Sequence, residues 1–329
     1  MASTGSAGGV YKNFPKVKTF LKVYLLGHTE WRQEVVPMLE RYSREPGFKY
    51  VNSPEFAAYP HTYDFFSAEE DLAKMSRVKK WFAIHGALAG EPGWFEVWRQ
   101  AVAYAQWAER MKIRMSEDSH QEVLDGKRKS SFPDLFLANI GPVIGDCIAL
   151  GWLDEAEHLA SMTRTALDRE ARGPYEVFND AGDRFGLRRT QHFILRLVAD
   201  WKGWAPPTGP KCAFDEPLFN ALIEKWRTTD LDELAALLAA ACDRHTHQSR
   251  MDAFSRNAFY DMRDWELWYD PFEVLSVLRL RDSLGLPNPQ VRHPLLDTPL
   301  GVLPPVTPLY SDELLEGVLE QARKERPAF

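Results

Sequence analysis

The chain has 329 residues, of which 45% are hydrophobic and 26% charged, so its composition is globular and excludes an intrinsically disordered protein. The net charge of −7 argues against nucleic-acid binding, because an acidic surface repels phosphates. Residues 204–329 carry 13 Lys and Arg against 20 Asp and Glu, so the excess acidity lies in the C-terminal part. Such a surface is either simply solvated or attracts a basic partner.

The cysteines and the N-terminus indicate a compartment. Cys147, Cys212 and Cys242 are odd in number and far apart, which excludes a disulfide framework and favours a reducing environment. Residues 1–12 lack the basic and apolar regions of a secretory signal and are expected to form a flexible tail. No run of about 18 apolar residues is present. We therefore expect a soluble, cytoplasmic protein.

The first elements in chain order are two weak strand candidates, 20–26 and 48–52. A long helix follows, with Ser67 and Glu70 as a capping box and Gly90 as its stop. The next segments are a helix over 91–115, with Pro92 in its first turn, and a polar, mobile loop over 116–131, with Lys127, Arg128 and Lys129 as a basic patch.

The middle of the chain predicts a helical hairpin over 132–170, broken at Gly151 and Trp152. Another helix is expected over 188–204, and residues 205–213 have the Pro and Gly content of a linker.

Beyond the linker, three helices precede a proline-rich segment and a last helix. Asp215 is expected to cap the first, and Asp270 and Glu273 to form a capping box around Pro271 in the third. The third should stop at Gly285. Prolines exclude a regular helix in the segment that follows and indicate a strap across the surface. The expected helices span residues 214–227, 228–247, 270–285 and 311–325, and the strap spans residues 286–308.

These patterns predict an all-α fold made of packed helical hairpins in two lobes, with a Pro-rich C-terminal strap and at most a minor strand element near the N-terminus. The expected boundaries are a tail over 1–12, a helical lobe over 13–203 and an acidic helical lobe over 204–329.

The stretch ACDRHTHQSR, 241–250, places Asp243, His245 and His247 close together beside Cys242. On a helix, His245 falls on the apolar stripe, whereas His247 is rotated by about 200° and pairs with Asp243. Metal ligands must converge, so this spacing disfavours a metal site. We expect the end of a helix instead, although a metal-dependent hydrolase using these three residues remains an alternative.

Residues 256–273 alternate aromatic and acidic side chains. Aromatic anchors ringed by acids are typical of an interface for a basic protein. The alternative is that the aromatics fill the core while the acids face water. The candidate partner-binding residues are Tyr260, Asp261, Asp264, Trp265, Glu266, Trp268 and Asp270.

A helix of the form P-x-E-x-L-x-x-L-R-L-R begins at Pro271 and is followed by G-L-P-N-P, H-P-L-L and P-L-G. Together with CDRHTHQSR, this pattern resembles the all-helical immunity proteins of bacterial polymorphic toxins over roughly residues 214–303. It looks like the cognate inhibitors of type VI secretion effectors, including those paired with nuclease toxins of the restriction-endonuclease fold.

The resemblance implies a cytoplasmic antitoxin that binds its toxin stoichiometrically, with no enzymatic activity and no cofactor. It implies a basic partner if the toxin is a nuclease, since a nuclease groove binds phosphates. It assigns no inhibitory residues. A helical scaffold that binds peptides between its lobes is a further alternative.

Overall fold

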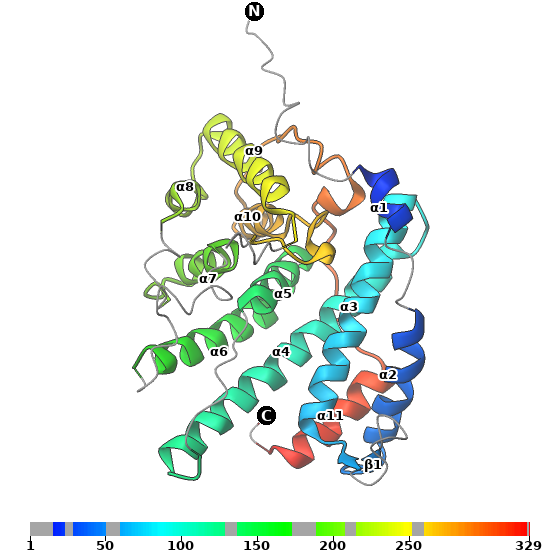
Figure 1. The fold of residues 1–329 in the computed structure, drawn as a ribbon. Helices are drawn as coiled ribbons and strands as arrows, with labels where there is room; N and C mark the ends of the chain where they lie inside the picture. The colour runs from blue at the N-terminus through cyan, green and yellow to red at the C-terminus, as the bar shows by residue number, and fades with distance from the viewer. Residues whose placement is uncertain are drawn as a thin grey trace, which may run out of the picture.

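The computed structural model shows a helical protein (Figure 1). The residues it describes are 16–23, 29–50, 60–128, 137–172, 189–207, 215–251, 260–327 and 329. The helices in chain order are α1 (Val17–Val23), α2 (Thr29–Tyr42), α3 (Phe65–Ala89), α4 (Trp94–Leu124), α5 (Leu137–Leu150), α6 (Leu153–Arg172), α7 (Arg189–Lys202), α8 (Pro217–Lys225), α9 (Leu231–Gln248), α10 (Phe272–Ser283) and α11 (Glu313–Glu325), with 3-10 turns η5 (Trp265–Leu267) and η6 (Pro299–Gly301).

The all-α prediction is confirmed, including the minor strand element allowed near the N-terminus. Strands β1 (Lys49–Tyr50) and β2 (His61–Thr62) form a short antiparallel pair. The candidate strand over 20–26 is wrong where it is described, because residues 20–23 belong to α1. The predicted tail over 1–12 lies outside the described residues.

The longest elements, α3 and α4, form an antiparallel hairpin (Figure 1). Asp64 caps α3 by accepting hydrogen bonds from the backbone N–H groups of Phe66 and Ser67 at 3.1 and 3.2 Å. Gly90 ends α3 with a φ of 75°, which a side chain would disfavour. The predicted stop is therefore confirmed, but the cap is Asp64 and not Ser67. Helix α2 packs on the outside of this hairpin together with α11.

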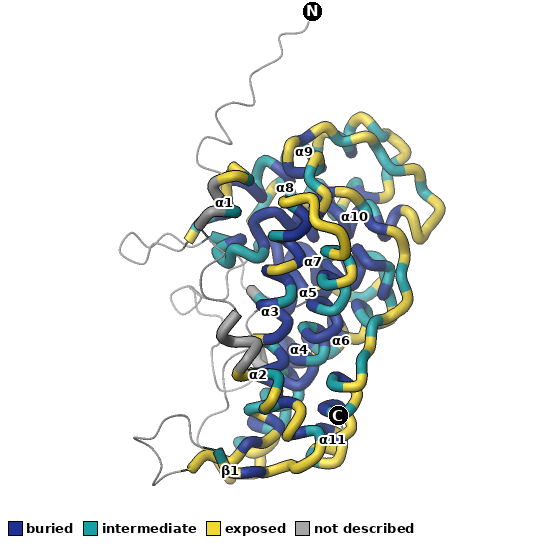
Figure 2. The backbone as a smooth tube through the Cα atoms, turned by 90° about the vertical axis from the view of Figure 1, so that its right-hand side faces the viewer, coloured by how far each residue is buried: buried dark blue, intermediate teal, exposed yellow. Residues whose placement is uncertain are grey.

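Helix α5 is the centre of the other half of the molecule. It packs against α4, α6, α7 and α10, and Figure 2 shows it among the buried parts of the chain. Two glycines of α5 permit close approaches to its neighbours: a Cβ on Gly141 would lie 2.5 Å from Gln191, and one on Gly145 would lie 2.6 Å from Phe272. The predicted break between α5 and α6 is confirmed at Gly151, with a φ of 80°.

The proline-rich strap crosses the surface as predicted, without an α-helix among its residues. Two buried arginines of α10 hold it. Arg281 donates to the carbonyls of Trp226 and Pro287, both at 2.5 Å, and Arg279 donates to those of Ala149 and Pro304. Guanidinium groups suit this task because one planar fork supplies several donors.

Three further predictions differ from the structure. Residues 116–124 continue α4, so the predicted loop is wrong over this range. Asp215 does not cap α8, whose N-cap is Glu216. Asp270 and Glu273 do not form a capping box, because their carboxylates point to partners on other helices. Helix α10 still stops before Gly285, which has a φ of 68°.

Helices from both sides of the predicted lobe boundary near residue 204 pack together, since α10 lies on α5 and α7. The boundary itself stays a prediction, and most of the expected linker lies outside the described residues. Within the described part of the chain, no helix has the length and apolar character needed to span a bilayer.

Candidate functional site

The stretch 241–250 forms the end of α9 and does not gather into one site. His245 is fully buried, His247 is exposed, and Asp243 faces His293, whose Nε2 lies 3.3 Å from Oδ1 of Asp243. Cys242 is a buried free thiol. Across the ranges described above, no cluster of three or more His, Cys, Asp or Glu is placed to hold a metal ion.

His245 instead joins two helices. Its Nδ1 lies 2.8 Å from Oε1 of Glu273 on α10, and its Nε2 lies 2.9 Å from the carbonyl oxygen of Leu267. Both neighbours are acceptors when Glu273 is ionised, and this geometry favours a ring that donates from both nitrogens, which is the imidazolium form. Burial opposes this charge, but the carboxylate of Glu273 and these hydrogen bonds outweigh it and raise the pKa of His245. The pair is a structural ion pair between α9 and α10.

The acidic and aromatic segment is divided between the core and the surface. Asp261 is buried and caps α7: its carboxylate accepts from the backbone N–H groups of Arg189 and Thr190, both at 3.1 Å. It also accepts from Arg244 of α9 at 2.6 Å. Asp261 therefore fixes α7 against α9 and offers little surface to a partner.

The two tryptophans of the segment differ in burial. Trp268 is 8% exposed and its indole N–H donates to the carbonyl of Met262 at 2.8 Å. Trp265 is half-buried with its ring beside that of Trp81, at a centroid distance of 6.0 Å. Tyr260 is half-buried near Arg250. Trp268 therefore fills the core, as one of the two interpretations of this segment expected. The partner-binding role stays a prediction for those candidate residues whose side chains solvent can reach.

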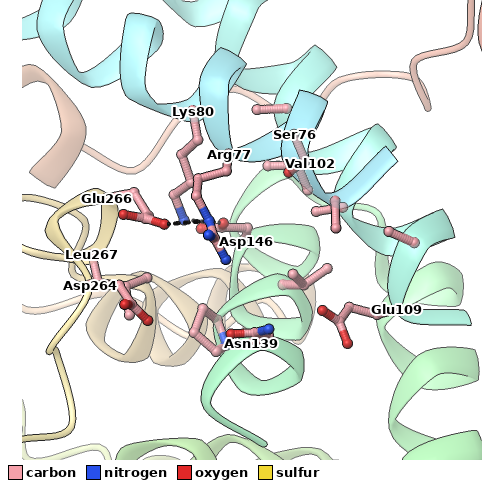
Figure 3. A pocket seen from close by; sticks show the side chains of 16 residues that line it. Ser76, Arg77, Lys80, Val102, Glu109, Asn139, Asp146, Asp264, Glu266 and Leu267 are labelled. Carbon is pink, nitrogen blue, oxygen red and sulfur yellow. Dashed lines mark hydrogen bonds and ion pairs between the residues drawn. The ribbon is translucent and has the colours of Figure 1, made fainter. Parts of the chain in front are cut away.

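Asp264 and Glu266, at η5, border a pocket between α3, α4 and α5 (Figure 3). The pocket has a volume of about 80 Å³. Apolar side chains form much of its wall, including four alanines. Its charged lining residues are Arg77, Lys80, Glu109, Asp146, Asp264 and Glu266, four carboxylates against two cations among the residues described. We call this the acidic pocket.

The deep end of the acidic pocket is a buried ionic cluster. Lys80 of α3 is 8% exposed, and its Nζ lies 2.6 Å from both Oδ2 of Asp146 on α5 and Oδ2 of Asp270 before α10. One ammonium thus faces two carboxylates. Burial and the charge of Asp270 raise the pKa of Asp146, because two anions sharing one cation are unfavourable in the interior.

The mouth of the pocket is more accessible. Arg77 of α3 reaches across it to Glu266, with Nε 3.1 Å from Oε1, and the Glu266 side chain is 19% exposed. The Asp264 side chain is 32% exposed. Among the proposed interface residues, these two are the acids that a partner can reach.

Glu109 reaches the pocket from α4 (Figure 3). It is 5% exposed, and in the described part of the chain no donor reaches its Oε2. The same holds for Oδ1 of Asp146. Burial raises the pKa of Glu109 to about 7, although Lys112 and Arg77 partly oppose the shift. Buried acceptors without donors are rare in folded proteins and mark a place for a ligand or water.

Lys80, Glu109 and Asp146 were not among the site residues predicted from the sequence. A signal existed for two of them, since Asp146 stands alone in the apolar run IGPVIGDCIAL and Glu109 lies seven residues after buried Val102. Single charges on apolar faces are unusual enough to note. Their convergence depends on helix packing, which the sequence pattern does not reveal.

Comparison with known proteins adds no relative. No family model, curated protein or solved structure matches this chain.

Proposed function

We propose that this protein is an immunity protein, which neutralises a secreted antibacterial toxin by binding it stoichiometrically through an acidic surface. The observation that carries the proposal is the acidic pocket, whose mouth presents Asp264 and Glu266 to solvent beside half-buried Trp265. Aromatic and acidic groups together favour a basic protein partner.

The resemblance of roughly residues 214–303 to immunity proteins supports the same role. In the structure, several residues of its characteristic motif stabilise the fold. Arg279 and Arg281 hold the strap, and Glu273 binds His245. The metal-hydrolase alternative draws no support from Asp243, His245 and His247, which face different surroundings. We propose a nuclease as the toxin, because a phosphate-binding groove has the basic charge that the acidic pocket complements.

The direct test is inhibition of the toxin encoded by the neighbouring gene. We expect purified protein to abolish toxin activity at one equivalent and co-expression to restore growth of cells that produce the toxin. Full toxin activity in the presence of excess protein would end the proposal.

Charge reversal maps the surface. Asp264→Lys with Glu266→Lys should slow association with the toxin and reduce its dependence on salt, because these acids steer a basic partner. Rates are measured by stopped flow, with Glu224→Lys on α8 as the matched control, an exposed acid remote in sequence from the pocket residues. Unchanged rates in the double variant, with the fold intact by circular dichroism, would place the interface elsewhere.

A further inference from the structure

The acidic pocket has a depth and an unmet hydrogen-bonding capacity that a flat acidic surface lacks. Its interior carboxylates come from two helices, Glu109 from α4 and Asp146 from α5. Each is at least nine-tenths buried, and within the described ranges each keeps one oxygen without a donor. Lys80 already binds the other oxygen of Asp146. The missing partners are therefore donors that approach from the mouth of the pocket.

The charges select the kind of donor. Four carboxylates line the pocket against the two cations Arg77 and Lys80, and Asp270 adds a further carboxylate behind Lys80. Because too few cations surround Glu109 and Asp146, burial raises the pKa of both, and a bound cation would favour their ionised forms, which an anion or a neutral donor would not. A cationic donor satisfies both the charge and the free acceptors, and the alanine-rich wall suits an aliphatic stem.

We propose that the acidic pocket is a receptor for one basic side chain, an arginine guanidinium or a lysine ammonium, which passes Glu266 and donates to Glu109 and Asp146. The proposal rests on the proposed function in that the side chain belongs to the toxin. A free organic cation has the same chemistry, and the experiment below separates the two sources.

The ionisation of Glu109 links this binding to pH. Its pKa is raised to about 7 by burial, so a cation beside it displaces a proton near neutral pH. Binding should therefore strengthen as the pH rises from about 6 to 8. The charged groups that surround Glu109 are Lys112 on α4, Glu69, Arg77 and Lys80 on α3, Asp146 on α5, and Asp264 and Glu266 at η5.

The first experiment uses the full chain with labelled alanine methyl groups, because Ala101, Ala105 and Ala108 line the pocket. The probes are Nα-acetyl-arginine methylamide and its citrulline counterpart, which is similar in shape but neutral. We expect the arginine probe to shift these methyl resonances, more at pH 8 than at pH 6, and citrulline to leave them unchanged. Equal shifts with both probes, or none with either, would overturn the proposal.

Two variants show whether Glu109 receives the cation. Glu109→Gln keeps the shape of the side chain and should remove the response to the arginine probe, whereas Glu224→Gln on α8 should leave it unchanged. Melting curves verify that both variants are folded. An undiminished response in folded Glu109→Gln would contradict the assignment of the pocket.

The second experiment asks whether the cation is a side chain of the toxin, and it tests this separately from the proposed immunity function. Wild type and Glu109→Gln are titrated with an inactive toxin domain, and the variant should bind about tenfold more weakly or worse. Equal binding by both proteins would overturn the toxin side chain as ligand while the immunity function stands. A response to the arginine probe without toxin binding would make a free cation the ligand and end the immunity function instead.

Discussion

Glu109 is a carboxylic acid that its surroundings favour in the neutral form. Its folded pKa of about 7 lies above the ordinary value of 4.5, so the native state binds its proton more tightly than the unfolded chain. The stability that this proton contributes is present at low pH and is lost as the pH rises above about 4.5 towards 7. A residue that weakens the fold at neutral pH is typical of a functional site.

Glu109→Gln should therefore stabilise the protein at pH 8, by about 1–3 kcal/mol in the free energy of unfolding, and have little effect at pH 5. Urea unfolding at both pH values measures this difference. A loss of stability of equal size at both pH values would show instead that the carboxylate has a structural role.

Lys80 has the reverse role, because it neutralises two buried carboxylates. Lys80→Met would leave Asp146 and Asp270 without their cation and should cost about 3–5 kcal/mol. Adding Asp146→Asn should recover part of the loss, since it removes one of the two anions. Denaturant midpoints of the single and double variants test this, and a single variant within about 1 kcal/mol of wild type would refute it.

At the scale of elements, the α5–α6 turn and the strap depend on one glycine. Gly151 has a φ of 80°, and a Cβ there would lie 2.8 Å from Cγ1 of Val306 on the strap. Beside it, the indole of Trp152 donates to the carbonyl of Thr307 at 3.0 Å. The turn is thus shaped both by backbone conformation and by the passing strap.

Gly151→Ala should destabilise the protein by about 1–2 kcal/mol through left-handed strain and the contact with Val306. In a Val306→Ala background the penalty should shrink but persist, because the backbone strain remains. Thermal melts of the four proteins decide this. A Gly151→Ala variant as stable as wild type would show that the turn relaxes freely.

The helix ends and the strap could be predicted from the sequence where the residues that determine them are close together in the chain. Glycines marked the ends of α3 and α5, and prolines excluded a helix from the strap. Capping boxes failed where the acid had a more distant partner: Glu273 meets His245, which is 28 residues away in the chain. The acidic pocket required Lys80 and Asp146 to meet across 66 residues, which only helix packing determines.

At the scale of the whole molecule, several buried titratable groups make the fold more stable at lower pH. The pKa of His245 is raised, so its stabilisation is complete below about 6.5 and is lost as the pH rises through its folded pKa. Burial raises the pKa of Glu69 to about 8 and that of Glu109 to about 7, so both also favour the fold at lower pH. His192 acts oppositely, because burial lowers its pKa to about 4 and stability falls as the pH drops below 6.5.

The protein should therefore be less stable at pH 8 than at pH 6.5, by a few kcal/mol at most. Glu69→Gln with Glu109→Gln should flatten this decline, and Glu224→Gln should leave it as it is. Calorimetric melting temperatures across this range test the expectation, and a rise in stability from pH 6.5 to 8 in wild type would contradict it.

The central proposal is that the acidic pocket of this helical protein binds a basic toxin. The most direct measurement is calorimetric titration of this protein with the catalytically inactive toxin domain encoded by the neighbouring gene. We predict nanomolar binding at a one-to-one ratio that weakens as salt increases. An absence of binding at micromolar concentrations would contradict the central claim.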